Sequence, residues 1–304
     1  MMTRNDLTYH TPVLLQKAIE AINIRPDGIY VDATFGGGSH SRSILSRLGN
    51  GKLVAFDQDP DAKNNLIDDE RFIFIPQNFR YLKNYLKFYG IRQIDGILAD
   101  LGVSSHQLDT PHRGFSFRFN EPLDMRMNPN LTLTAAEWIK TASESEIAEV
   151  LYKYGELKNS GRLAHHIKKA ALAEHLNTTQ DLVESIQHLF PAGKWKQFMP
   201  QVFQAIRIKI NDELGALEDL LKQSIEVLKP KGRLVVISYH SLEDRMVKNF
   251  MKYGNTEGKP VKDMYGKLIA PLKVIKKKPI TPDLEEIESN PRSRSAKLRV
   301  AEKI

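Results

Sequence analysis

Cysteine is absent from this chain of 304 residues. Without it the protein can form neither disulfides nor thiolate metal sites, a composition that suits a reducing cytoplasm. Long apolar runs are lacking as well. Runs such as Arg233–Tyr239 have the length of a strand, far short of the roughly 20 residues that a membrane helix needs. The polar N-terminus contains no apolar segment typical of a signal peptide. We therefore expect a soluble, cytoplasmic protein without a membrane segment.

Acidic residues are fewer than basic ones in this chain. Lys and Arg total 44 against 37 Asp and Glu, which gives a formal net charge of +7. A basic balance favours polyanionic partners, because each cation placed on a phosphate releases condensed counterions. Hydrophobic residues make up 41% of the chain, enough to bury the core of one large domain or two modest ones. Nucleic acid is therefore a candidate partner, and a generically basic surface is the alternative.

Short apolar runs alternate with helix-length stretches in the first third of the chain. Near-continuous apolar strands are typical of a parallel sheet covered on both faces, so the pattern predicts an α/β fold with a mostly parallel, doubly wound sheet. An amphipathic helix that starts at Pro12, capped by Thr11, is expected to precede it. The expected strands are Ile29–Phe35, Lys52–Asp57, Phe72–Pro76, Ile94–Asp100 and Arg233–His240.

A helical segment interrupts this pattern between the fourth and fifth strands. The segments 143–146 and 178–181 both have the spacing of a capping box ahead of apolar residues at helical intervals. A single long helix is expected over residues 200–228, and a last edge strand over 295–302. We expect a discontinuous sheet domain of residues 1–110 and 201–304 with an all-helical insert of residues 111–200.

A glycine-rich turn follows the first strand, in the run Asp32–His40. Glycines let the backbone approach a ligand closely, and the helix N-terminus behind the turn presents free N–H groups. Gly36 and Gly38 match the first two glycines of the dinucleotide fingerprint, but Ser41 occupies the third position. The turn therefore favours a ligand without a pyrophosphate, such as S-adenosylmethionine. A tight turn with no ligand is the alternative.

Asp57 ends the second strand, and 57 − 36 places it 21 residues after Gly36. An acidic residue at this spacing reaches the hydroxyl pair of a ribose, and its carboxylate can accept hydrogen bonds from both hydroxyls. Asp59 competes for the role, and a strand-end turn former is the alternative. The turn and Asp57 together indicate an adenosine-containing cofactor.

Asp100 ends the fourth strand, where the chain enters a long loop. Ligands of a doubly wound sheet bind outside the carboxyl ends of its strands, so this loop faces the same crevice. The carboxylate could accept a hydrogen bond from an amine that attacks a methyl group, or it could only cap the strand. Ser241 and Glu243 suggest a helix cap, and His240 is either a packed or a site residue. No cluster of metal ligands stands out, and no metal is predicted.

Seven blocks of the sequence follow one known pattern. They are His10–Leu15, Asp32–His40, Asp100–Asp109, Arg113–Arg118, Pro122–Met127, Ser238–Arg245 and Asn290–Arg299. Together they resemble the bacterial 16S rRNA cytosine-N4 methyltransferase family, over nearly the whole chain and in the same order. The resemblance implies a Rossmann-like class I methyltransferase with S-adenosylmethionine as cofactor. It also implies a target, the N4 amine of a cytosine in the decoding region of 16S rRNA in the small ribosomal subunit.

The resemblance also implies where the cofactor is held. Phe79 would pack against the adenine. At Ser39 the chain departs from the family, which has a glycine there, and a positive φ would strain the serine. The cofactor contacts carried over from the family are Gly38, Ser39, His40, Asp57, Phe79, Asp100 and Gln107.

The chemistry expected from this resemblance depends on positioning and charge. The cytosine amine is a poor nucleophile, because its lone pair is delocalised into the ring. An acceptor on its N–H would direct that lone pair at the methyl carbon, and Asp100 or the carbonyls of the turn that follows it are the candidates. Phe115, Phe117 and Tyr239 are candidates to stack on the flipped base.

Basic residues of the insert and of the C-terminal part are expected to grip folded rRNA, and the chain could also act as a homodimer. Three other functions stay open: a DNA amino-methyltransferase, a nicotinamide-dependent oxidoreductase, and a non-catalytic RNA-binding ribosome assembly factor. The basic residues are Lys168, Lys169, Lys194, Lys196 and the run Lys276–Lys278.

Overall fold

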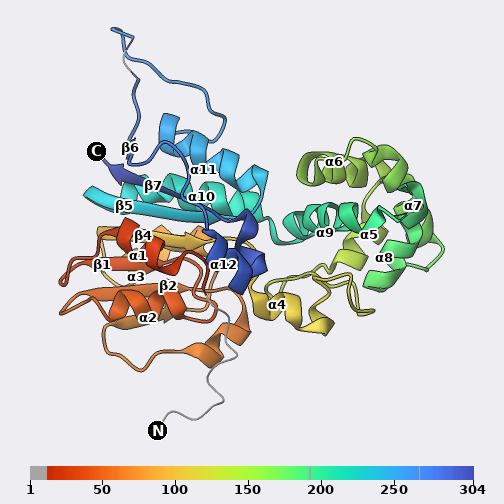
Figure 1. The fold of residues 1–304 in the computed structure, drawn as a ribbon, viewed down its shortest axis with the longest axis horizontal. Helices are drawn as coiled ribbons and strands as arrows, with labels where there is room; N and C mark the ends of the chain where they lie inside the picture. Colours follow the sequence, from red (N-terminus) through yellow and green to blue (C-terminus); the bar gives the residue numbers. More distant parts are fainter. Residues whose placement is uncertain (1–11, 192, 267) are drawn as a thin grey trace. The chain divides into compact units, whose positions relative to one another are not determined.

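The chain forms two compact units in a computed structural model that describes residues 12–191, 193–266 and 268–304 (Figure 1). The sheet unit consists of the chain up to Gly102 together with Leu214–Ile304, and the inserted unit is Val103–Glu213. The bounds expected for the insert, 111–200, fall inside this second unit. Among the residues described, no helix has the length and apolarity needed to cross a membrane.

A seven-stranded sheet forms the centre of the sheet unit, in the order β3-β2-β1-β4-β5-β7-β6. The first five strands run parallel, and β7 pairs antiparallel with both β5 and β6. The doubly wound α/β fold is thus confirmed. The C-terminal strand, however, is not at the edge as expected, because β6 pairs with its outer side. The strands are β1 Ile29–Asp32, β2 Lys52–Phe56, β3 Phe72–Ile75, β4 Ile94–Asp100, β5 Leu228–Ser238, β6 Leu272–Val274 and β7 Lys297–Lys303.

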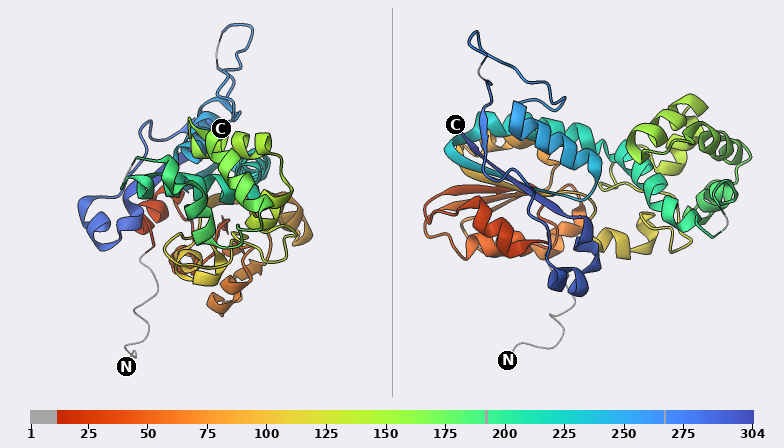
Figure 2. Two further views of the ribbon diagram at one scale, coloured as in Figure 1. Left: turned by 90° about the vertical axis from the view of Figure 1, so that its right-hand side faces the viewer. Right: turned by 45° about the horizontal axis from the view of Figure 1, so that its top comes forward.

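Helices cover both faces of the sheet (Figures 1 and 2). Successive residues of a strand point to opposite faces. In β4, Leu98 packs into the core formed with α1 and α2, whereas Ile97 and Ala99 pack into the core formed with α3, α10 and α11. This burial on both faces explains why the strands are apolar almost throughout. The helices are α1 Leu15–Ile22, α2 Ser39–Leu45, α3 Leu82–Phe88, α10 Glu213–Val227 and α11 Ser241–Tyr253.

The first helix starts later than the sequence predicts. Leu14 has a φ of 52°, in the left-handed region, so the helix cannot begin at Pro12 and begins at Leu15 instead. The N–H of Leu14 donates to Oε1 of Glu286, 2.6 Å away on α12 (Leu284–Ser289). A carboxylate distant in sequence therefore takes the place of a local N-cap. Thr11, the expected cap, lies outside the described residues.

The inserted unit is helical and has a hydrophobic core of its own. The capping box of Thr178 and Asp181 is present, and Ser143 accepts a hydrogen bond from the N–H of Glu146. The single helix expected over 200–228 is wrong. Asp212 has a φ of 47°, which ends α9 and lets α10 begin as a separate helix. The helices of the unit are α4 Ser105–Asp109, α5 Ala135–Thr141, α6 Glu144–Gly155, α7 Ser160–Leu172, α8 Thr179–Ile186 and α9 Trp195–Asn211.

Candidate active site

The carboxyl ends of the five parallel strands lie at one edge of the sheet. From β1 the strand order continues to β2 and β3, and from β4 to β5 in the opposite direction, so the switch point lies between β1 and β4. Ligands of open α/β sheets bind at such a point. The strand ends bring Asp32, Asp57, Asp100 and Tyr239 to this edge.

The glycine turn between β1 and α2 takes two positive φ angles, 49° at Gly36 and 75° at Gly38. A Cβ atom at Gly36 would meet nothing within 4 Å, so the backbone there faces open space. At Gly38 the positive φ would strain any other residue, and a Cβ would also lie 3.0 Å from ring atoms of Phe35, so this position favours glycine. Ser39 is the first residue of α2 and is not among the residues with positive φ. The strain expected at this serine is therefore absent.

Asp57 lies directly after β2 and is tied to the glycine turn. Its Oδ2 accepts the N–H of Gly36 at 2.7 Å, and its Oδ1 accepts the N–H of Asp59 at 2.8 Å. Burial raises the pKa of Asp57 to about 6. Each carboxylate oxygen has a second lone pair, so Asp57 can still accept from a pair of ligand hydroxyls. Asp59, the competing candidate, instead caps the 3₁₀ helix η1 (Pro60–Asn65) by accepting the N–H of Asp61.

Asp32 is a buried carboxyl group that the sequence did not single out as a site residue. It ends β1 and is only 1% exposed. It accepts from the hydroxyl of Ser41 at 2.7 Å and from the N–H of Thr34 at 3.1 Å, and burial raises its pKa to about 6. The hydroxyl of Thr34 accepts the N–H of Asp100 at 2.7 Å. This chain of bonds fixes the glycine turn to the end of β4.

Asp100 meets two side chains at the end of β4. Tyr239, which follows β5, donates its hydroxyl to Oδ1 of Asp100 at 2.7 Å. Nδ1 of His40 lies 4.0 Å from Oδ2. Burial raises the pKa of Asp100 to about 6 and lowers that of His40, so at neutral pH the carboxylate is mostly charged and the imidazole is neutral. In the described part of the chain, Nε2 of His40 has no hydrogen-bond partner, although it is buried.

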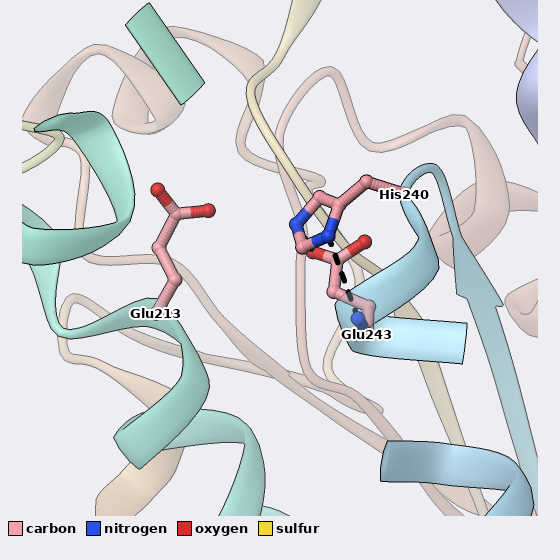
Figure 3. A group of neighbouring side chains, drawn as sticks. All are labelled: Glu213, His240 and Glu243. Carbon is pink, nitrogen blue, oxygen red and sulfur yellow. Dashed lines mark hydrogen bonds and ion pairs between the residues drawn. The ribbon is translucent and has the colours of Figure 1, made fainter. Parts of the chain in front are cut away.

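The start of α11 holds the backbone of Tyr239 through Glu243, which Figure 3 shows beside His240. Glu243 is 3% exposed, and its carboxylate accepts the N–H of Tyr239 at 3.0 Å. The N–H of Glu243 donates to Nδ1 of His240, which caps the helix in place of the expected Ser241. Glu213, also drawn in Figure 3, belongs to the inserted unit, where it accepts two hydrogen bonds from Arg207. Sequence reasoning assigned no site role to Glu243, because its partners come from folding.

Two further predicted site residues, Phe79 and Gln107, lie in short helices, one in each unit. Phe79 starts the 3₁₀ helix η2 (Phe79–Tyr81) after β3, where its ring packs against the core under α3. Gln107 lies in α4 of the inserted unit and is 5% exposed. Its side chain accepts the N–H of Ser104 at 3.0 Å and completes a capping box. The cofactor roles of Phe79 and Gln107 stay predictions.

The three aromatic residues expected to stack on a base have other surroundings. Phe115 is 7% exposed within the core of the inserted unit, so its ring has no free face to offer. Phe117 packs on that core, with its ring centroid 5.6 Å from that of Phe203 and 6.4 Å from that of Trp195. Tyr239 is partly buried, and its hydroxyl is bound to Asp100.

The chain is similar in sequence to known proteins over nearly its whole length. The model of the MraW methylase family matches residues 7–304. A protein of Bacteroides thetaiotaomicron named ribosomal RNA small subunit methyltransferase H is 54% identical over 303 residues, which cover 99% of this chain and 100% of that protein. A protein of the same name from Flavobacterium johnsoniae is 52% identical over 299 residues, covering 98% and 99%. The crystal structure of an rRNA methylase from Streptococcus thermophilus is 12% identical, with a TM-score of 0.40 and coverage of 95% and 93%.

Proposed function

Because this chain belongs to the MraW methylase family, as its seven sequence blocks indicated, we propose its target: the N4 amine of a cytosine in the decoding region of 16S rRNA. The acceptor would be presented by the small ribosomal subunit in the cytoplasm. The name of these relatives, ribosomal RNA small subunit methyltransferase H, supports small-subunit rRNA as the substrate. The single observation in the fold that carries the chemistry is the ionisable Asp100, held by Tyr239 at the switch point of the sheet.

The residues at this edge fit S-adenosylmethionine, the cofactor of the family. Open space at Gly36 admits a ligand against the backbone, and the neighbouring Asp57 carboxylate has free lone pairs for the two ribose hydroxyls. The unpartnered, buried Nε2 of His40 offers one more polar contact within the described structure. Gly38, Ser39, Phe79 and Gln107 complete the proposed set. When bound, the cofactor supplies an electrophilic methyl group on a positively charged sulfur.

We assign to Asp100 the task of orienting the target amine. Its carboxylate, mostly charged at pH 7, accepts an N–H of the amine and thereby draws the nitrogen lone pair out of the cytosine ring. Tyr239 holds Oδ1 in a fixed position by its hydroxyl, and the neutral His40 adds no competing cation beside Oδ2. A preorganised acceptor needs no reorganisation as the reaction proceeds. Contacts of this kind accelerate a reaction for that reason.

The inserted unit is proposed to recognise the rRNA around the target. It has its own core and joins the chain directly after β4, next to Asp100 in sequence. A base that must leave its stack is selected by the surrounding RNA shape, which calls for an RNA-binding surface in addition to the catalytic one. A homodimer stays a prediction.

The test is methyl transfer with competing acceptors. The protein is incubated with S-adenosylmethionine carrying a labelled methyl group and with unmodified small ribosomal subunits, double-stranded DNA or a short oligonucleotide. We expect label in the 16S rRNA of the subunits and little in the other two. Label mainly in DNA would identify a DNA amino-methyltransferase. Binding to the subunits without any transfer would identify an assembly factor, and either result would contradict the proposal.

A further inference from the structure

The outer face of α7 in the inserted unit carries a cluster of basic side chains that the proposed chemistry does not use. Arg162, His166 and Lys169 follow one another at intervals of four and three residues, so they share one face of the helix. The imidazole of His188, from the 3₁₀ helix η4 (Gln187–Leu189), lies against His166 with a centroid distance of 4.9 Å. The ring centroid of His165 lies 5.6 Å from that of His166.

The two strong cations of this face have no acidic partner among the residues that the structure describes. Other basic residues of the same unit differ. Lys153 is paired with Glu149, and Lys140 with Glu174. Lys168, expected from the sequence to contact RNA, instead donates to the carbonyl of Lys140 at 2.8 Å. The ammonium group of Lys168 therefore already has a hydrogen-bond acceptor within the inserted unit.

The positive charges of this face change the pKa of an imidazole within it. Partial burial and the charges of His188, His165, Arg162 and Lys169 together lower the pKa of His166. His165 has an acidic neighbour: its Nδ1 lies 3.1 Å from a carboxylate oxygen of Glu144 on α6. Clustered like charges destabilise a folded surface unless an anion binds to them, so such a face fits a negatively charged partner.

We propose that this face, formed by Arg162, His166, Lys169 and His188 and called here the α7 cation face, binds the phosphate backbone of the rRNA. The proposal rests on the proposed function, which supplies the polyanion. Guanidinium and ammonium groups are the usual phosphate ligands. The seven-residue interval between Arg162 and Lys169 is about 10 Å along the helix axis, which suits two phosphates rather than one. The imidazoles between them can hydrogen-bond phosphate or ribose oxygens.

The test compares two double variants of the full-length protein. Arg162→Gln with Lys169→Gln removes the two unpaired cations. Lys140→Gln with Lys153→Gln removes two equally exposed lysines of the same unit whose charges are already paired. All four positions are exposed, so folding is preserved, and melting temperatures verify this. The measurements are affinity for unmodified small ribosomal subunits over a series of KCl concentrations, and KM and kcat for the same particles.

The α7 variant should lose about 1.4–1.8 from the slope of log affinity against log salt, since each of the two phosphate contacts contributes about 0.7–0.9. Its KM should rise about tenfold or more, with kcat and cofactor affinity unchanged, while the paired-lysine variant keeps the wild-type slope. Equal slopes in the two variants, or a loss of kcat at an unchanged slope, would overturn the α7 face. If the wild type binds the particles but transfers no methyl group, the proposed function fails. The salt slopes of the two variants still show in that case whether the α7 cation face binds the rRNA.

Discussion

Asp32, Asp57 and Asp100 all have pKa values of about 6, because burial disfavours their charged forms. At pH 7 they are nevertheless ionised by about ten to one. Since these pKa values are raised above those of the unfolded chain, the folded protein binds more protons between about pH 4 and pH 6. These groups therefore lower the free energy of unfolding as pH rises through that window. The three carboxylates at the edge of the sheet thus stay charged at neutral pH, and this lowers the free energy of unfolding.

Asp57→Ala should weaken S-adenosylmethionine binding by roughly 1.5–3 kcal/mol, the scale of hydrogen bonds to a charged group. The wild-type affinity should also fall as pH drops below about 6, where Asp57 becomes protonated. Isothermal titration over a pH series measures both. Asp59→Ala is the control: it should lose about 1 kcal/mol of stability as a helix cap, with cofactor affinity retained. Unchanged affinity in Asp57→Ala would move the ribose contact to another residue.

Asp100→Asn separates chemistry from structure. The amide keeps an oxygen for the hydroxyl of Tyr239 but loses the charge and adds a donor toward the amine. Turnover at saturating cofactor should fall by about two orders of magnitude, with cofactor affinity changing much less. The melting temperature should stay or rise, because a buried charge has been removed. Wild-type turnover would exclude Asp100 from catalysis, and a lower melting temperature with full activity would make it a strand-end cap.

Tyr239→Phe tests whether this residue positions Asp100 or stacks on the base. The hydroxyl of Tyr239 lowers the pKa of Asp100, so its removal should raise that pKa above about 6. The acid limb of the pH–turnover profile should then move to higher pH, with activity largely recovered at alkaline pH. Tyr265→Phe, a change at an 88% exposed ring, is the matched control. An unshifted profile would show that the hydroxyl has no part in the charge state of Asp100.

At the residue scale the sequence predicted those site residues that lie at the ends of strands or at a typical spacing from the glycine turn. Asp57 and Asp100 follow apolar runs, and parallel strands bring such ends together, so both lie at the expected edge. Asp32 and Glu243 were not assigned to the site, because their importance comes from burial and from partners distant in sequence. The burial of Phe115 in the core of the inserted unit was not predicted, because an aromatic residue looks alike in sequence whether it packs in a core or faces a ligand.

At the element scale the parallel strands were predictable, because burial on both faces leaves a continuous apolar run. β6 was missed, since its three residues contain too little pattern. The break between α9 and α10 was missed because apolar residues keep helical spacing straight through Asp212. The start of α1 depends on Glu286, which lies 272 positions away in sequence. Local signals thus predict the elements but not the boundaries set by tertiary contacts.

Glu286→Ala should destabilise the sheet unit through α1. The carboxylate accepts the N–H of Leu14 and lies 4.0 Å from the ammonium group of Lys17. Its loss leaves the helix start without its acceptor, which should cost about 1 kcal/mol or more in the free energy of unfolding. Urea denaturation measures this value. The neighbouring exposed Glu285→Ala should change it by less than about 0.5 kcal/mol, and equal effects of the two changes would refute the capping role.

At the scale of the whole molecule, one chain supplies a cofactor-binding sheet and a separate helical unit inserted after its fourth strand. The sheet unit is complete only when the C-terminal segment adds β5, β7 and β6 to the first four strands. We propose that methyl transfer and recognition of a folded RNA have separate surfaces, one in each unit. This division explains why a small, unstructured substrate should be poor even though the catalytic edge is intact.

We propose that this enzyme methylates the N4 amine of a cytosine in small-subunit rRNA. The most direct measurement is mass spectrometry of nucleosides from 16S rRNA, taken from unmodified small subunits after incubation with the protein and S-adenosylmethionine. The account predicts a gain of one methyl group on cytidine at N4, confined to the decoding region and absent with Asp100→Asn. A methyl group on another base or atom, or no methylated nucleoside at all, would contradict it.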